Sequence, residues 1–408
     1  VPNLRFPEFQ GEWEKFTFDE IAQYKKGPFG SALKKDLFVP QSENAIKVYE
    51  QQNAIKKDWT LSRYYITKDY FNTHMKQFVA KAGDLIVSCA GTIGEVYELP
   101  KDAEEGVFNQ ALMRVRVNNE IVNKEIFITV FSSMIDKFSK IYSNGSAIKN
   151  IPPFADLKRT QVYLPCKEEQ IVIAQLLRSL DERIATQSKI IDKLQSLIKG
   201  LEDNLLDNPL WKKTYLRSFM QFFPTNSLSW EQLSYKEGAI RNLHYGLIHS
   251  FQTRGINSAS LPMIKNEAIP KQYTLCQVGD VAFADASEDT GEIAKSVEFV
   301  DTIEGDTICG LHTIHGRDIK NRTVVGFKGF AFNSRYFHHQ IKRLAQGTKV
   351  FSITANNLSS CYVYLPDLET QKAIVKLLKA YETQLIVSRK TLKQYEKQKQ
   401  YLLRQMFI

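Results

Sequence analysis

Two segments of the chain, one central and one at its end, have hydrophobic residues spaced as in a coiled coil. In the central segment the two core positions of the heptad are occupied by Leu177, Ile184, Ile191, Ile198 and Leu205, and by Leu180, Leu194 and Leu201. In the final segment they are occupied by Leu378, Leu385, Leu392 and Met406, and by Tyr381, Tyr395 and Leu402. Polar residues interrupt the pattern at Gln187, Ser388 and Lys399. Heptads sustained over about four repeats predict two long helices that pair with each other, rather than each packing only on its own domain.

The remaining sequence alternates short apolar runs with turn-forming Gly and Pro residues. Before the central helix, the pattern predicts strands at Asp84–Ser88, Leu112–Val117 and Gln161–Leu164 and a helix near residues 123–142. Before the final helix, it predicts strands at Gln277–Ala284 and Thr323–Phe327 and a helix near residues 333–345. The predicted fold class is therefore α+β, with each mixed domain followed by a long helix.

The chain repeats itself. The run Val162–Pro165 recurs as Val363–Pro366, 201 residues later, and Gln170 recurs at the same spacing as Gln371. Two weaker similarities pair Ala82–Ile86 with Val278–Ala282, and Trp13-Glu14 with Trp230-Glu231. If the two halves are related by a two-fold axis perpendicular to the helices, the helices must pair antiparallel. The predicted segments are a first domain at 1–165, a central spacer helix at 166–208, a linker at 209–229, a second domain at 230–366 and a C-terminal spacer helix at 367–408.

The composition excludes several classes of protein and suggests that the chain binds a polyanion. The 408 residues are 43% hydrophobic and 24% charged, which excludes an intrinsically disordered chain. Lys and Arg outnumber Asp and Glu by 54 to 45, and a net charge of +9 suits a polyanionic partner. No apolar run reaches the ~18–20 residues of a membrane helix. The 5 cysteines are scattered and form no C-x-x-C pair, which fits a reducing cytoplasm.

No catalytic constellation is recognisable in the sequence. There is no Gly-Lys dipeptide, and hence no phosphate-binding loop of the usual kind. Residues 150–154 resemble the loop that holds a flipped adenine in amino-methyltransferases, but Ile151 interrupts the motif and no glycine-rich cofactor loop accompanies it. Cys309, His312 and His315 have metal-ligand spacing, yet residues three apart on a strand point to opposite faces. We therefore predict no catalytic site, no metal site and no cofactor bound by this chain.

Together these features resemble the specificity subunit of type I restriction-modification systems. The similarity covers essentially the whole chain: the opening Leu4–Phe9, a Trp-Glu near each domain start, a Gly-Ser or Gly-Thr followed by isoleucine before each Leu-Pro, and the two heptad helices. The resemblance implies that each mixed domain is a target recognition domain and that the helices form an antiparallel spacer. It implies a bacterial, cytoplasmic, non-catalytic subunit that reads an asymmetric, two-part DNA sequence with a fixed unread gap.

The resemblance also implies the partners of the chain. Two methylation subunits and two restriction and translocation subunits would supply adenine methylation and DNA cleavage. S-adenosylmethionine, ATP and Mg²⁺ would be held by those partners and not by this chain. The candidates for contact with the methylation subunits are exposed residues of the central helix, namely Arg183, Lys189, Lys193 and Lys199.

Polar residues on the irregular loops are the candidates for DNA contact, because Lys and Arg neutralise phosphates while Asn, Gln, Ser and Arg read base edges. In the first domain they are Lys25, Lys26, Ser31, Lys34, Lys35, Thr92, Ser146, Lys149 and Asn150. In the second domain they are Arg241, Asn242, His244, Tyr245, His249, Arg254 and Lys349.

The length of the spacer predicts the spacing of the two half-sites. The heptad span Leu177–Leu205 comprises 29 residues, which as a helix is ~43 Å long. One turn of B-DNA is ~34–36 Å, so we expect half-sites about one helical turn apart. Inserting one heptad into both helices should widen the unread gap by ~3 base pairs.

Three other functional classes remain compatible with the sequence. The closest rival is a coiled-coil adaptor that binds only protein; it would lack the steep salt dependence of DNA affinity that phosphate contacts produce. A free-standing enzyme would bind S-adenosylmethionine or ATP as an isolated chain. A two-domain transcription regulator would need no methylation partner.

Overall fold

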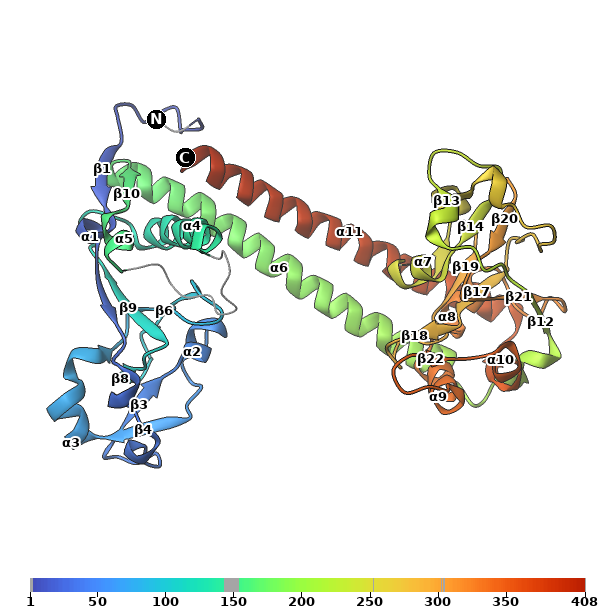
Figure 1. Cartoon of the computed structure of the whole chain (residues 1–408), viewed down its shortest axis with the longest axis horizontal. Coiled ribbons are helices and arrows are strands. Elements are labelled where there is room, and N and C mark those ends of the chain that lie inside the picture. The colour runs from blue at the N-terminus through green and yellow to red at the C-terminus, as the bar shows by residue number, and fades with distance from the viewer. Residues whose placement is uncertain (1–2, 143–153, 252, 302, 304, 408) are drawn as a thin grey trace. The chain divides into compact units, whose positions relative to one another are not determined.

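The computed structural model describes residues 3–142, 154–251, 253–301, 303 and 305–407 of the chain. The chain divides into two compact units, Val1–Ile184 with Tyr395–Ile408, and Ala185–Gln394. Each unit consists of a mixed α/β domain and parts of the two long helices, α6 (Lys167–Leu206) and α11 (Leu368–Met406) (Figure 1).

The domain of the first unit is built on two four-stranded sheets. One is antiparallel, in the order β2-β9-β6-β7, and the other has the order β4-β3-β8-β5 with β3 parallel to β8. A separate pair joins β1 (Glu14–Thr17) to β10 (Gln161–Leu164), the strand that precedes α6. The remaining strands are β2 (Ala22–Lys26), β3 (Ala45–Tyr49), β4 (Tyr64–Thr67), β5 (Val79–Ala80), β6 (Leu85–Ser88), β7 (Val96–Glu98), β8 (Gly106–Phe108) and β9 (Leu112–Val117).

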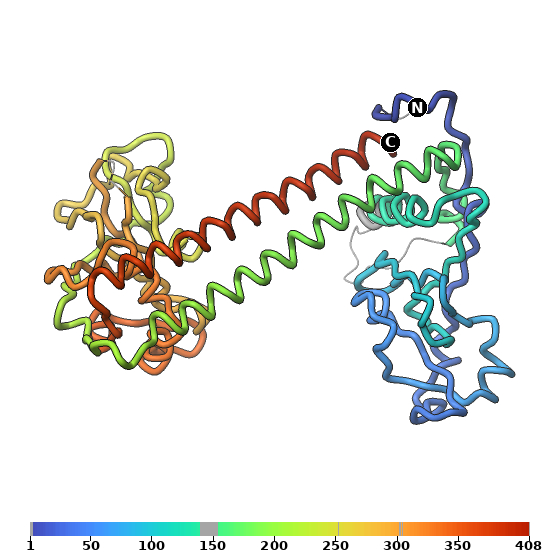
Figure 2. Tube along the Cα trace, turned by 180° about the vertical axis from the view of Figure 1, so that it is seen from behind, coloured from blue at the N-terminus to red at the C-terminus, as the bar shows by residue number. Residues whose placement is uncertain are grey.

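Helix α4 (Lys124–Tyr142) covers the antiparallel sheet of the first unit. Its apolar residues recur at helical spacing, so they form one face that is buried against β6, β9 and the start of α6. Figures 1 and 2 both show α4 beside α6. The buried residues of this face are Ile126, Phe127, Val130, Phe131, Met134 and Ile135.

The second unit repeats the plan. Its larger sheet has the order β12-β21-β17-β19-β15, and its smaller sheet has the order β13-β16-β14-β20 with β14 parallel to β20. Two helices, α8 (Phe327–Ala331) and α9 (Arg335–Leu344), replace α4, and β11 (Lys212–Tyr215) pairs with β23 (Tyr362–Leu365) before α11. The remaining strands are β12 (Met220–Phe223), β13 (Leu233–Ser234), β14 (Arg241–Leu243), β15 (Gly255–Ile256), β16 (Met263–Ile264), β17 (Val281–Ala284), β18 (Ala286–Ser287), β19 (Ser296–Phe299), β20 (Thr307–Cys309), β21 (Thr313–Asp318) and β22 (Phe351–Ser352).

The duplication extends to individual hydrogen bonds. The side-chain amide of Gln170 donates to two backbone carbonyl oxygens and accepts from the N–H of Asn123, just before α4. The amide of Gln371 does the same and accepts from the N–H of Val324, just before α8. Each glutamine therefore ties the start of a long helix to the loop that leads into the helix covering the sheet.

A carboxylate–guanidinium pair is also common to the two domains. Asp84 pairs with Arg116 on the first antiparallel sheet, and Asp280 pairs with Arg317 on the second, with Nε–Oδ1 distances of 2.7 and 2.8 Å. The glycine before each aspartate has a φ of +83° or +89°, which a residue with a Cβ adopts only under strain. The sequence similarity around Ala82–Ile86 and Val278–Ala282 thus reflects a shared turn.

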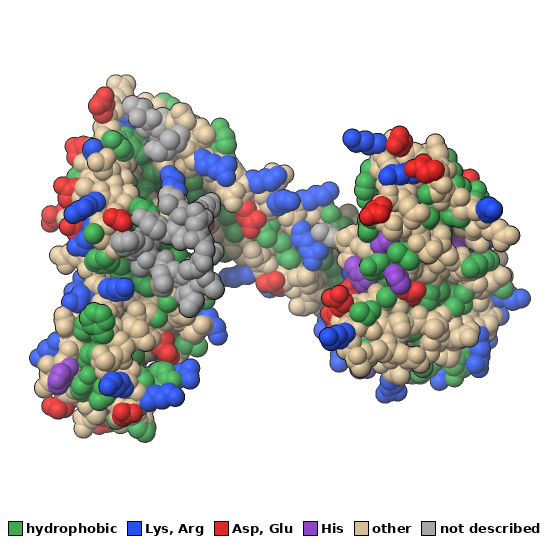
Figure 3. Space-filling view, in the orientation of Figure 1, with side chains coloured by type: hydrophobic (Ala, Val, Ile, Leu, Met, Phe, Trp, Pro, Cys, Tyr) green, Lys and Arg blue, Asp and Glu red, His purple; other side chains and the backbone are tan. Residues whose placement is uncertain are grey.

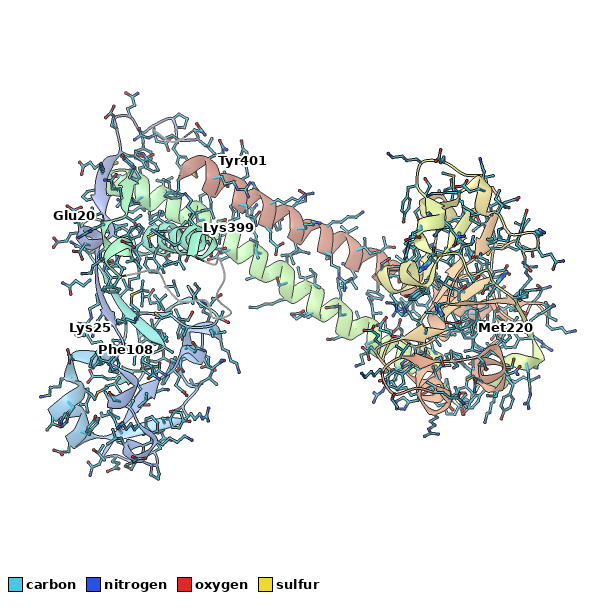
Figure 4. The ribbon with its side chains drawn as sticks, viewed as in Figure 1. Glu20, Lys25, Phe108, Met220, Lys399 and Tyr401 are labelled. Carbon is cyan, nitrogen blue, oxygen red and sulfur yellow. The ribbon has the colours of Figure 1, made fainter. Side chains whose placement is uncertain are left out.

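Within each unit the two long helices run antiparallel. In the second unit the Gln187 side chain donates to the carbonyl oxygen of Ser388, at 3.2 Å. In the first, Lys399 pairs with Asp181 and lies between α11 and α6 (Figure 4). The polar residues that interrupt the heptads therefore bond across the helix pair, and antiparallel pairing is confirmed in each unit. No helix among the described residues is long and apolar enough to cross a membrane.

The predicted linker at 209–229 is wrong. Within 209–229, β11 pairs with β23 and β12 pairs with β21, so these residues belong to the second domain. Strand β11 lies in a two-stranded sheet and three of its four residues are exposed, so it lacks the alternation that marks a half-buried strand.

Two further expectations were wrong for related reasons. Trp13 corresponds to Trp211 and not to Trp230, because Trp13 and Trp211 each precede the strand that pairs with the strand before a long helix. The apolar run Thr323–Phe327 is no strand; it is a turn that leads into α8. Both errors arose because short sequence motifs and apolar runs were interpreted without knowing which strands pair.

Candidate nucleic-acid interface

Three loops leave the antiparallel sheet of the first unit at the same edge. Lys26 at the end of β2 lies opposite Met113, and Ser88 at the end of β6 lies opposite Leu112, the first residue of β9. The loops after β2, after β6 and before β9 must therefore emerge together. These loops, residues 26–35, 89–95 and 109–111, are referred to as the first edge surface.

Most of the DNA-contact candidates of the first domain lie on the first edge surface. Five of them are exposed there, namely Lys26, Ser31, Lys34, Lys35 and Thr92. Lys25 differs because alternate strand residues face opposite ways: its Nζ donates to Oε1 of Gln77 at 2.7 Å and lies 5.0 Å from the centre of the Phe78 ring (Figure 4). The other three candidates, Ser146, Lys149 and Asn150, fall outside the described residues.

An aromatic residue on this surface escaped the sequence analysis. Phe29 is 90% exposed and stands between Lys26 and the pair Lys34-Lys35. A bare aromatic ring among lysines suits stacking or wedging against bases, while the ammonium groups neutralise phosphates. The exposure of Phe29 could have been predicted from the run Pro28-Phe29-Gly30, because an apolar side chain in a tight turn has no neighbours to cover it.

The second unit has a corresponding edge. Phe223 at the end of β12 lies opposite His315, and Ala284 at the end of β17 lies opposite Thr313, the first residue of β21. The two-stranded β18–β22 sheet follows the same edge because β18 begins two residues after β17 ends. The candidate Lys349 lies in the turn before β22, which the bridge between Gln346 and Ser352 closes. Residues 224–230, 244–249, 285–295, 310–312 and 346–352 are referred to as the second edge surface.

Histidine and aromatic rings form a continuous cluster on the second edge surface. The ring of His244 lies 4.4 Å from Trp230 and 4.7 Å from Tyr245, and Tyr245 lies 5.3 Å from His312. Figure 3 shows histidine side chains gathered on this face of the second unit. Burial, aided by His312, lowers the pKa of His244, so its ring stays neutral at pH 7. The residue is 3% exposed and its Nδ1 accepts from the N–H of Gly246 at 3.2 Å, so His244 supports the cluster from inside the fold.

Carboxylates accompany these rings. Asp285 pairs with His312 at 3.1 Å, and Glu292 pairs with Lys295 at 2.9 Å and with the candidate His249 at 3.4 Å. Burial raises the pKa of Asp285, although His312 opposes the shift. Burial would also raise the pKa of Glu292, but hydrogen bonds from Lys295 and His249 outweigh it and hold the pKa below its ordinary value. Carboxylate acceptors suit the amino groups of cytosine.

Two candidates of the second domain are structural. Asn242 is fully buried: its Oδ1 accepts from the side chain of Asn226 at 2.8 Å, and a Cβ on Gly310 would lie 2.4 Å from its Nδ2. The guanidinium of Arg241 donates to the backbone carbonyl oxygens of Ala259 and Leu261. The expectation for Asn242 was therefore wrong, because the residue type shows a capacity for hydrogen bonding but not its direction. DNA contact by the partly exposed Arg241 stays a prediction.

Arg254 also serves the fold. Its backbone N–H donates to Oε1 of Glu382 on α11 at 2.9 Å, and its guanidinium lies 3.5 Å from Glu202 on α6. Arg254 thus anchors the domain of the second unit to both long helices, a role that was not predicted from the sequence; its contact with DNA stays a prediction. These acceptors lie 52 and 128 residues away in the sequence, beyond the reach of any local pattern.

The four partner-contact candidates on α6 are all exposed, namely Arg183, Lys189, Lys193 and Lys199. Apolar side chains accompany them. Ile190 and Leu197 are 39% and 43% exposed, and they share one heptad position outside the core. Exposed apolar residues rimmed by charged ones are typical of a protein-binding surface.

Comparison with known proteins agrees with this arrangement. The family described as type I restriction modification DNA specificity domain matches residues 10–196 and 310–397. The chain is similar to the type I restriction enzyme MjaVIII specificity subunit of Methanocaldococcus jannaschii, with 22% identity over 421 aligned residues, covering 98% of this chain and 92% of that protein. A putative MjaX specificity subunit of the same organism is 27% identical over 260 residues, covering 60% of this chain and 58% of that protein.

Two solved structures have the same fold. The S subunit of a type I restriction-modification system from M. genitalium aligns with a TM-score of 0.57 and 16% identity, covering 100% of this chain and 99% of that one. A chain from a study of complex assembly and conformational transition in the type I R-M system aligns with a TM-score of 0.58 and 15% identity, covering 97% of both.

Proposed function

The chain belongs to the type I restriction-modification DNA specificity family, and we propose that its two edge surfaces each read one part of a two-part, asymmetric DNA target. A specificity subunit recognises DNA sequence, and the family matched is a specificity family rather than a catalytic one. The finer assignment rests on one observation, the contrast between the framework and the edges of the two domains.

The framework is shared and the edges differ. Gln170 and Gln371 make the same hydrogen bonds, and Asp84 and Asp280 hold equivalent arginines. The first edge surface carries lysines and Phe29, whereas the second carries histidines, aromatic rings and carboxylates. Two domains of one fold with different contact residues are what reading two different half-sites requires.

The two surfaces divide the work of recognition. On the first, Lys26, Lys34 and Lys35 neutralise phosphates and Phe29 contacts bases. On the second, Tyr245 and Asp285, packed against the buried ring of His244 and against His312, supply the donors and acceptors that discriminate base edges. Lys349, in the turn before β22, adds a phosphate contact.

The long helices set the unread gap. α6 and α11 comprise 40 and 39 residues, and the 29-residue heptad span corresponds to ~43 Å, close to one turn of B-DNA. Half-sites one turn apart would face the same side of the duplex.

The exposed stripe of α6 holds the methylation subunits, with Ile190 and Leu197 packing and the surrounding lysines and Arg183 pairing with acidic groups. Two methylation subunits and two restriction and translocation subunits then modify or cleave the DNA. Their S-adenosylmethionine, ATP and Mg²⁺ supply the chemistry, and this chain contributes only the recognition of the DNA sequence.

A domain exchange tests the proposal. Residues 207–366 are replaced by the corresponding segment of a relative with a different target, and the hybrid is co-expressed with its methylation subunit. Sequencing of methylated adenines should show a new second half-site with the first half-site and the gap unchanged. A change in both halves would contradict modular reading. A matched exchange that starts at residue 230 would separate β11 and β12 from their partners, and we expect it to fail to fold.

A further inference from the structure

Two thiols and an imidazole lie together inside the second domain. Cys276 precedes β17, Cys309 ends β20 and His315 is on β21, and one ligand atom of each lies within 4.8 Å of the others. The three residues are 7%, 3% and 1% exposed, and the two Sγ atoms are 3.6 Å apart. None of them is needed for the DNA contacts proposed above.

We propose that Cys276, Cys309 and His315 bind a zinc ion. Two thiolates bound to one tetrahedral zinc, at ~2.3 Å from the metal, stand ~3.8 Å apart, close to the separation found here. Two thiolates and an imidazole are a soft donor set that favours zinc over magnesium or calcium.

The environment of His315 fits a metal ligand. Its Nε2 lies 2.7 Å from Oδ2 of Asp280, a carboxylate that is 1% exposed and also pairs with Arg317. A metal-bound histidine characteristically donates its second ring N–H to such a carboxylate, which fixes the ring and its tautomer. With Nε2–H held by Asp280, Nδ1 is the nitrogen that faces the metal.

The first domain shows that the fold does not require this cluster. Strand pairing and spacing from the shared Asp–Arg pair place Ala80, Phe108 and Arg114 at the equivalent positions. There the Arg114 guanidinium lies 5.7 Å from the ring centre of Phe108 (labelled in Figure 4), so the same space is filled by packing. The second domain has metal-binding residue types at all three positions.

The fourth coordination position can be filled by water. Cys309 borders a cavity of about 280 Å³ that is also lined by Asn226, Tyr273 and Thr274. Three protein ligands and one water are a common zinc arrangement, and the cavity has room for the water. Because Asn226 belongs to the second edge surface, the metal would fix the segment before β17 next to the residues proposed to contact DNA.

Metal analysis of the full chain tests the proposal. The chain is purified under reducing conditions without chelators, and we expect about one zinc per chain by mass spectrometry of the metals. Cys276→Ser and Cys309→Ser should each lose the zinc. Cys361→Ser is the matched control, because Cys361 is a buried thiol of the same unit outside the cluster, and it should keep the zinc. The cobalt(II)-loaded chain should show a thiolate-to-cobalt absorption that is absent in Cys309→Ser.

Three results would overturn the proposal. The first is a reduced wild-type chain that contains no zinc and does not gain thermal stability when zinc is added. The second is a disulfide between Cys276 and Cys309 in the chain isolated without reductant. The third is zinc retained by both cluster variants. If circular dichroism shows that a variant does not fold, the zinc content and the cobalt spectrum of the wild-type chain alone decide whether the site binds metal.

Discussion

The Gln187 side chain donates a hydrogen bond to the backbone carbonyl oxygen of Ser388, and these two residues occupy the same position in the two repeats, 201 residues apart. Equivalent residues of two antiparallel repeats can face each other only where the symmetry axis of the pair passes. Gln187 and Ser388 therefore mark that point in the α6–α11 pair. They are also two of the three residues that interrupt the heptads, and polar residues in a heptad core set register at a cost in stability.

Replacing both residues with apolar ones should stabilise the helix pair and weaken the selection of its register. In Gln187→Leu with Ser388→Leu, two apolar side chains would fill core heptad positions, and we expect the free energy of unfolding to rise by ~1–2 kcal/mol. Urea unfolding followed by circular dichroism measures the change. Gln195→Leu, at an exposed position of α6, is the control and should show no gain. A double variant less stable than the wild type would contradict this role for the pair.

The two buried glutamines should act locally. Gln371 is fully buried and makes three hydrogen bonds, so Gln371→Ala leaves backbone groups unpaired and should cost ~2–4 kcal/mol. Hydrogen exchange should rise in residues 322–326 and stay unchanged at residues 121–123, whereas Gln170→Ala should do the reverse. The exposed Gln195→Ala is the matched control. Equal exchange in both units for either variant would show that the two glutamines do not act independently.

Arg254 and Lys349 should separate folding from DNA binding. Arg254→Ala removes a contact with Glu202 and should destabilise the second unit while leaving the salt dependence of DNA affinity unchanged. Lys349→Ala should leave stability unchanged, weaken binding to all DNA sequences and lower the slope of log affinity against log salt by ~1. Fluorescence anisotropy at several salt concentrations and thermal unfolding measure both properties. The reverse pattern would show that Arg254 contacts DNA and that Lys349 serves the fold.

Two acidic residues beside Arg254 should make stability depend on pH. Burial raises the pKa of Glu202 and of Glu382, and Arg254 opposes both shifts only in part. A raised pKa means that the folded state binds the proton more tightly. The stability that these two groups contribute is therefore fully present below the unfolded pKa of ~4.3 and is lost as the pH rises through their folded pKa values.

The variant Glu382→Gln keeps an acceptor for the Arg254 N–H and removes one carboxylate. We expect the stability of the variant relative to the wild type to rise from acid to neutral pH, because the variant lacks one carboxylate that is costly to ionise in the folded state; urea unfolding across that range measures the difference. Glu369→Gln, at an exposed position of the same helix, should reproduce the wild-type profile. A Glu382→Gln profile that coincides with the wild type would contradict the assignment.

The parts of the fold that the sequence predicts well are those with a long or buried pattern. The heptads locate α6 and α11 to within two residues, and alternation locates β9 and β10. Strands β11 and β12 were missed because one is mostly exposed and both are short, so their partners rather than their residues define them.

The same division holds for the candidate interface. Lys34, Lys35 and Lys349 are exposed, as expected, because a charged side chain on a loop stays in water whatever the fold around it. The burial of Asn242 and the bonds of Arg254 to α6 and α11 were not predicted, because the residues that surround them come from other segments of the chain. His312 and Asp285, which face each other from 27 residues apart, could be found only after β17 and β21 had been paired.

The most direct test of the account is to map methylation in a host that has no adenine methylation of its own. The chain is co-expressed with the methylation subunit encoded beside it, and the genome is sequenced for methyladenine. We predict a two-part motif with a constant gap, methylated on both strands and absent when this chain is omitted. No new methylation, although the complex assembles, would contradict the account and favour a protein adaptor.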